Sequence, residues 1–144
     1  MTDETHHHLF AEHLLPPDIL ARASRRGNEY AWPVDDIPLV IAAAKDALLA
    51  SVGGQLQFRL PDGATCECYW VNVDVGATPG SSWPERVEQS ARIALEKFED
   101  ARSRDDLLRE GMTFPSVAEA ATSGTDLESA MCFVWYLVDE HGST

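Results

Sequence analysis

The chain has 144 residues, 44% of them hydrophobic, which is enough to bury a core within one domain. Its 24 acidic and 11 basic side chains give a net charge of −13, which disfavours nucleic-acid binding because phosphates require a basic surface. No run approaches the ~20 apolar residues of a membrane span, so we expect no membrane insertion. The sequence also lacks a signal-peptide pattern, and three cysteines do not make a disulfide framework, so we expect a bacterial-type cytoplasmic protein.

Proline and glycine residues mark the first predicted helix. Pro16-Pro17-Asp18 is typical of a helix start and Gly27 of a helix end, so a short helix is predicted over residues 19–26. Residues 28–33 are predicted to form a connector with room for a short extended piece.

A second helix is predicted over residues 36–52. Apolar residues recur every three or four positions between Ile37 and Val52, which is the period of an amphipathic helix. Asp35 or Asp36 can cap its start, and Gly53-Gly54 is typical of a helix end.

The clearest pattern is a β-hairpin over residues 55–75. Polar and apolar residues alternate from Gln55 to Leu60, and Pro61-Asp62-Gly63 predicts a type I turn with a bulge. This turn sets a register whose facing pairs are Arg59 and Thr65, Phe58 and Cys66, and Leu56 and Cys68. One face is predicted to be the core face, and it carries Leu56, Phe58, Leu60, Ala64, Cys66, Cys68 and Trp70. The other face is predicted to point toward solvent, and it carries Gln55, Gln57, Arg59, Thr65 and Glu67.

The apolar positions change parity after Trp70, to Val71, Val73 and Val75. Two explanations are open, namely a bulge near residues 69–71 or burial of both faces of the strand. We favour the bulge, because it keeps the carboxylate of Asp74 out of the core.

The C-terminal half predicts the longest helix and a buried strand. Ser82 and Glu85 have capping-box spacing, and the apolar residues that follow them predict a helix over residues 82–102. Shorter helical segments are expected near Leu107 and after Pro115. Residues 130–138 are almost wholly apolar, which is typical of a central strand covered on both faces.

These elements predict a small α+β fold. Its antiparallel sheet has three to four strands, built from hairpin 55–75 plus strand 130–138, and helices 36–52 and 82–102 cover it mainly on one side. Residues 1–15 are expected to be a flexible N-terminal tail, and residues 16–144 a single domain.

No motif indicates catalysis, and we expect neither a cofactor nor a metal. Cys66 and Cys68 point the same way on a strand, but a structural zinc site needs four ligands, and Cys132 lies in another apolar strand. We therefore interpret the cysteines as small core residues. The sequence leaves open whether the protein is an enzyme, with the absence of motifs favouring that it is not.

Charge distribution supplies the leading functional hypothesis. No Lys or Arg occurs between Arg59 and Arg86, or after Arg109. The small size and concentrated acidity resemble those of immunity proteins and of inhibitors that occlude a basic site, although no motif accompanies this resemblance. We therefore predict a non-enzymatic module that binds a basic protein partner through a negatively charged face. Its candidate contacts are Asp62, Glu67, Asp74, Asp126 and Glu128.

The alternative hypothesis is a small-molecule-binding domain or minor enzyme. Its aromatic-lined pocket would lie between the sheet and helix 82–102, with Tyr69, Trp70 and Trp83 as lining residues. The sequence leaves the oligomeric state and the identity of any partner or ligand open.

Overall fold

The computed structural model describes residues 10–104 and 106–141. Its centre is a five-stranded antiparallel sheet with the strand order β1-β2-β5-β3-β4. The strands are β1 (Ser24–Arg26), β2 (Glu29–Pro33), β3 (Ala50–Arg59), β4 (Thr65–Asp74) and β5 (Met131–Val138). The α+β class is confirmed, but the predicted three to four strands are too few because β1 and β2 add a second hairpin.

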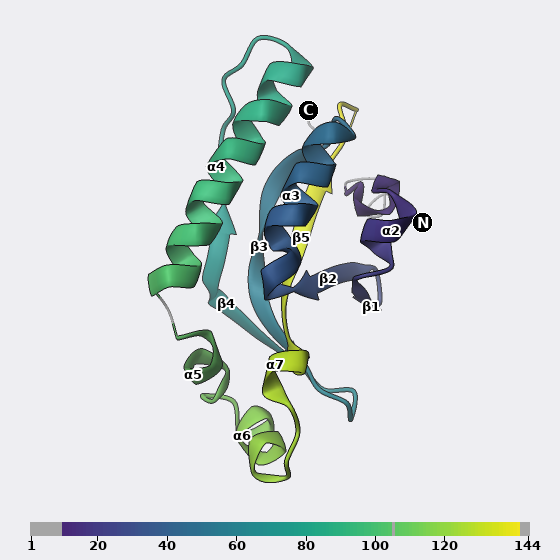
Figure 1. Ribbon diagram of the computed structural model, residues 1–144. Coiled ribbons are helices and arrows are strands. Elements are labelled where there is room, and N and C mark those ends of the chain that lie inside the picture. Colours follow the sequence, from purple (N-terminus) through teal and green to yellow (C-terminus); the bar gives the residue numbers. More distant parts are fainter. Residues whose placement is uncertain (1–9, 105, 142–144) are drawn as a thin grey trace, which may run out of the picture.

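The two main helices cover one face of the sheet, as Figure 1 shows. They are α3 (Ile37–Asp46) and α4 (Trp83–Arg104). The short helices are η1 (Glu12–Leu14), α2 (Pro17–Leu20), η2 (Val34–Asp36), α5 (Leu107–Gly111), α6 (Pro115–Thr122) and α7 (Leu127–Ala130). The last three connect α4 to β5 at one end of the sheet (Figure 1). Among the described residues, no helix is long and apolar enough to cross a membrane.

The helix predicted over residues 19–26 is wrong beyond Leu20, where α2 ends. Arg25 and Arg26 instead pair with Tyr30 and Glu29 in the β1–β2 hairpin. The guanidinium of Arg26 also donates to the carbonyl oxygens of Leu60 and Ala64, at 2.7 and 2.8 Å. This contact with a turn more than 30 residues away stabilises an extended backbone that local propensity did not indicate.

The helix predicted over residues 36–52 ends at Asp46, and Gly53-Gly54 lies inside β3 instead of ending a helix. A Cβ atom on Gly53 would lie 2.0 Å from the carbonyl oxygen of Val73, and one on Gly54 would lie 1.9 Å from that of Val134. The two glycines are therefore explained by the close approach of the neighbouring strands.

The predicted hairpin register is confirmed at all three pairs, including Leu56 opposite Cys68. The next residue of β3, Gln55, pairs with Asn72, so the register shifts between Leu56 and Gln55. Residues 69–71 of β4 therefore form the bulge that we favoured. Trp70 was predicted to share the core face, but the bulge turns it outward and leaves it 46% exposed. Val71 is buried in the core next to it.

The helix-covered face of the sheet carries the main core. Phe133 and Trp135 of β5 are buried there, and the ring of Phe98 from α4 contacts both, with centroids 5.3 and 6.3 Å away. β5 lies between β2 and β3, which confirms the prediction of a central strand. Helix 82–102 is confirmed with a slightly later end.

Arg59 was predicted to point toward solvent from the opposite face of the sheet, and this prediction is wrong. Arg59 is only 7% exposed, because the β1–β2 hairpin folds over it. Its guanidinium donates to the carbonyl oxygens of Ser24 and Glu29 and to the side-chain oxygen of Gln57. Burial lowers the pKa of Arg59, but the ring of oxygen acceptors satisfies its donors.

Residues 1–15 were predicted to be a flexible tail, and residues 1–9 of this segment lie outside the described residues. The rest of the segment packs on the sheet. Ala11 and Leu15 are buried, and the backbone N–H of Ala11 donates to the carbonyl of Leu137 at 2.8 Å. In return, the N–H of Leu137 donates to the buried carboxylate of Glu12 at 2.8 Å. This pairing covers an edge of β5 beyond its contact with β2.

Candidate functional site

The bulge in β4 presents two aromatic side chains at the edge of the sheet. Tyr69 is 67% exposed and Trp70 is 46% exposed, so apolar ring surface of both faces solvent. The side-chain amide of Asn72 donates to the carbonyl of Tyr69 at 2.7 Å, which closes the bulge. The bulge therefore holds both rings outward in a defined local conformation.

Trp70 is held by residues from the segment that follows α4. Its ring stacks on Phe114, with centroids 5.8 Å apart, and its indole N–H donates to a carboxylate oxygen of Glu110 at 2.6 Å. Its contact with Tyr69 is edge-to-face, with centroids 5.4 Å apart. We call Tyr69, Trp70, Glu110 and Phe114 the bulge patch.

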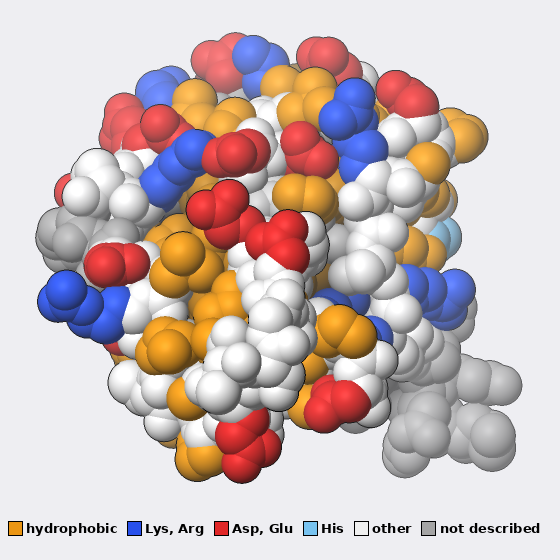
Figure 2. Space-filling view, turned by 60° about the horizontal axis from the view of Figure 1, so that its bottom comes forward, with side chains coloured by type: hydrophobic (Ala, Val, Ile, Leu, Met, Phe, Trp, Pro, Cys, Tyr) orange, Lys and Arg blue, Asp and Glu red, His pale blue; other side chains and the backbone are white. Residues whose placement is uncertain are grey.

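The bulge patch includes the carboxylate of Glu110, and the cation next to it in the chain, Arg109, pairs with Asp106. Among the side chains that the structure describes, no ion pair involves Glu110 or the nearby strand residue Glu67. Figure 2, which brings this end of the molecule forward, shows hydrophobic side chains grouped left of centre with acidic side chains beside them. Acidic and basic side chains are mixed across the upper part of that view (Figure 2).

The cysteines next to the bulge are buried and reduced. Burial raises the pKa of Cys68 to about 11, with the carboxylate of Glu110 as the next cause, and burial also raises the pKa of Cys66. Both thiols are therefore protonated near neutral pH and are poor nucleophiles. Among the described residues, no group of three or more His, Cys, Asp or Glu side chains lies close enough to hold a metal ion.

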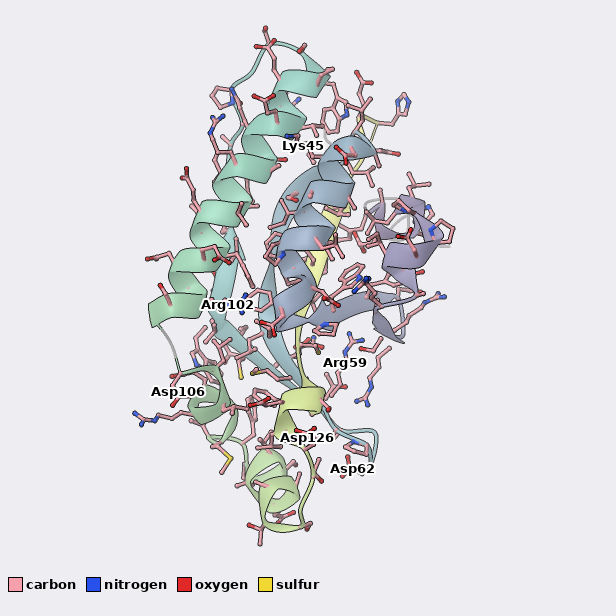
Figure 3. All side chains as sticks on the ribbon, in the orientation of Figure 1. Lys45, Arg59, Asp62, Arg102, Asp106 and Asp126 are labelled. Atoms are coloured by element: carbon pink, nitrogen blue, oxygen red, sulfur yellow. The ribbon has the colours of Figure 1, made fainter. Side chains whose placement is uncertain are left out.

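Three of the five predicted contact acids lie at one end of the molecule. Figure 3 shows Asp62 in the β3–β4 turn and Asp126 before α7 at that end, and Glu128 lies within α7. Asp62 accepts the N–H of Ala64, and Asp126 accepts the N–H of Glu128, so each carboxylate also stabilises a turn or helix start. Glu128 lines a shallow hollow together with Arg102.

The other two predicted acids lie elsewhere. Glu67 accepts a hydrogen bond from Gln57 at 2.9 Å on the face away from the main helices. Asp74 ends β4, roughly 30 Å along the strand from Thr65 at ~3.3 Å per residue. The five acids therefore do not gather on one surface, and Arg26 reaches the β3–β4 turn from β1.

The pocket residues are also divided. Tyr69 and Trp70 lie together, but Trp83 starts α4, a helix of 22 residues, or roughly 33 Å at ~1.5 Å per residue. There its indole N–H donates to the carbonyl of Leu48, and Arg86 lies over its ring. Buried side chains, including Ala94 and Phe98, fill the space between the sheet and α4.

Sequence reasoning missed two members of the bulge patch, Glu110 and Phe114. Each is 40 or more residues from Trp70 along the chain, and neither has a local sequence signal for this contact. The contact depends on how α5 folds back against β4.

No family model matches the chain, and no curated protein or solved structure gives a significant match to it. Functional inference therefore depends on the chemistry of the bulge patch and on the charge of the molecule. The patch offers two exposed aromatic rings and one carboxylate.

Proposed function

We propose that this protein is a non-enzymatic module that binds a basic partner protein through the bulge patch. The observation that carries the proposal is the exposure of Tyr69 and Trp70 on a bulge that holds them outward. Tyr and Trp are enriched among the residues that contribute most to binding energy at protein interfaces.

Preorganisation supports this role. Trp70 is already stacked on Phe114 and hydrogen-bonded to Glu110, so little side-chain freedom remains to be lost when a partner binds. A partner that covers the exposed part of the Trp70 ring gains the burial of apolar surface without first ordering that ring.

Charge indicates the kind of partner. Residues 60–85 and 110–144 contain ten acidic residues and no Lys or Arg, within a chain of net charge −13. A second copy of this chain would be repelled, whereas a basic protein would be attracted and would associate faster. In this proposal the predicted acids Asp62, Glu67, Asp126 and Glu128 act mainly by steering, over a Debye length of ~8 Å at physiological salt.

The test compares variants of the whole chain used as bait in an extract of the native host at low salt. The double variant carries both Tyr69→Ala and Trp70→Ala. Its control is Leu95→Ala, which removes an exposed apolar side chain from α4. We expect wild type and the control variant to retain the same basic proteins from the extract. The double variant is expected not to retain them, and high salt is expected to release them from wild type. Retention of the same proteins by the double variant would contradict the proposal.

A further inference from the structure

Among the side chains that the structure describes, arginines lie over aromatic rings at three places. The guanidinium carbons of Arg25, Arg86 and Arg102 lie over the rings of Tyr30, Trp83 and Phe98, at 5.5, 5.5 and 6.0 Å from the centroids. These distances are typical of cation–π contacts. Arginine is therefore the cation with which this chain covers its own rings.

The two most exposed aromatic rings have no such cation among the described side chains. Tyr69 and Trp70 lie within the segment between Arg59 and Arg86, which contains no Lys or Arg. Their neighbour Glu110 uses one carboxylate oxygen to accept the Trp70 indole N–H. A carboxylate has about four lone-pair sites, so Glu110 retains capacity to accept further donors.

We infer that the bulge patch binds an arginine side chain of the partner, with its guanidinium on the exposed ring surface of Tyr69 and Trp70 and paired with Glu110. This inference rests on the proposed function and names the chemical group that is recognised. A planar guanidinium suits the site better than an ammonium, because it stacks on a ring while its N–H groups donate to a carboxylate.

The direct test uses a peptide probe and the full-length protein. The Trp70 indole N–H signal in a ¹H–¹⁵N spectrum is followed during titration with acetyl-Gly-Arg-Gly-amide and with the citrulline peptide, which has nearly the same shape without charge. We expect the arginine peptide to shift this signal and the citrulline peptide to bind roughly fivefold or more weakly. Equal binding of the two peptides, or a lysine peptide that binds as tightly as the arginine peptide, would overturn the inference.

A charge variant gives an independent readout. Glu110→Gln keeps an oxygen for the Trp70 indole N–H but removes the negative charge, and Glu96→Gln on α4 makes the same change in net charge elsewhere. Glu110→Gln is expected to weaken binding of the arginine peptide roughly threefold to fivefold. Glu96→Gln is expected to leave the affinity for this peptide unchanged. Equal effects of the two variants would show that only overall charge matters, which also overturns the inference.

The two proposals fail in different ways. If partner capture is lost with Tyr69→Ala and Trp70→Ala but the arginine peptide shows no preference over citrulline, the proposed function stands and the arginine assignment falls. If the double variant captures the same proteins as wild type, the proposed function itself falls.

Discussion

The centre of the sheet and the bulged edge of β4 each hold a tryptophan whose indole N–H is hydrogen-bonded. In the centre, Trp135 is fully buried and donates to the hydroxyl of Ser51 at 3.2 Å. At the edge, Trp70 donates to Glu110 at 2.6 Å but stays 46% exposed. The hydrogen bond is similar in kind, and the difference lies in what covers the ring.

This difference separates stability from binding. At the centre, strands approach so closely that glycine is needed, and α4 covers the aromatic rings. At the edge, the bulge turns Trp70 out of the core row while Phe114 supports only part of its ring. We therefore expect substitutions at the centre to affect folding most, and substitutions at the edge to affect partner binding with a smaller effect on folding.

The largest effect is expected for Gly54→Ala. Its new Cβ would lie 1.9 Å from the carbonyl oxygen of Val134 and 2.7 Å from the ring of Trp135, so β3 and β5 could not keep their spacing. We expect loss of cooperative thermal unfolding, measured by circular dichroism. The control is Gly27→Asn in the β1–β2 turn, where nothing lies within 4 Å of a Cβ and the φ of +61° is one that Asn tolerates. A cooperative Gly54→Ala melt close to that of wild type would contradict the tight approach of these strands.

The next effect compares the two regions directly. Phe133→Ala at the centre is expected to lower the free energy of unfolding by about 3–5 kcal/mol, because it leaves a cavity beneath Phe98. Trp70→Ala at the edge is expected to lower it by about 1–2 kcal/mol, because the stacking on Phe114 and the hydrogen bond to Glu110 are lost while about half of the ring is already exposed. Urea denaturation measures both values, and losses of equal size would contradict the separation of core and binding surface.

An intermediate, pH-dependent effect is expected for Glu12, which accepts the N–H of Leu137 beside the sheet centre. Burial is the main cause that raises the pKa of Glu12 to about 7 from an ordinary value of 4.5, so the folded state holds a proton that the unfolded state releases. Stability is therefore greatest below about pH 4.5 and falls as the pH rises through about 7, by at most ~3 kcal/mol.

The measurement is urea denaturation of wild type and Glu12→Gln between pH 4.5 and 8. The difference in unfolding free energy between the two proteins isolates the contribution of Glu12 from that of neighbouring groups such as Glu29 and Tyr136. A difference that does not change with pH would show that Glu12 stays ionised in the folded protein.

The smallest effect on stability is expected for Asn72→Ala, which removes the hydrogen bond to the carbonyl of Tyr69 that closes the bulge. The expected loss is about 0.5–1 kcal/mol, because the bond is exposed to water. Partner binding should weaken more than stability, since the backbone that presents Tyr69 loses its fixed conformation. The comparison of urea denaturation with partner capture tests this, and unchanged binding would show that the bulge needs no such bond.

Sequence reasoning named Tyr69 and Trp70, half of the bulge patch, but as lining residues of an aromatic pocket and with Trp70 on the core face. Tyr69 and Trp70 stand out as aromatic residues beside a change of parity, which is a local pattern. Glu110 and Phe114 carry no local signal for their role, because their contact with Trp70 spans 40 or more residues. Likewise, the five predicted acids were chosen for their positions along the chain, and distance along β4 separates Asp74 from the rest.

The sequence by itself determined the elements whose signals are local. The hairpin register follows from the alternation of residues and the Pro61-Asp62-Gly63 turn, and the period of apolar residues specifies α4. Only the tertiary structure decided that Gly53-Gly54 lies in a strand, that the β1–β2 hairpin covers Arg59, and that α5 supports the bulge. The physical reason is that these features depend on the approach of segments distant in sequence, where packing and hydrogen bonds outweigh local propensity.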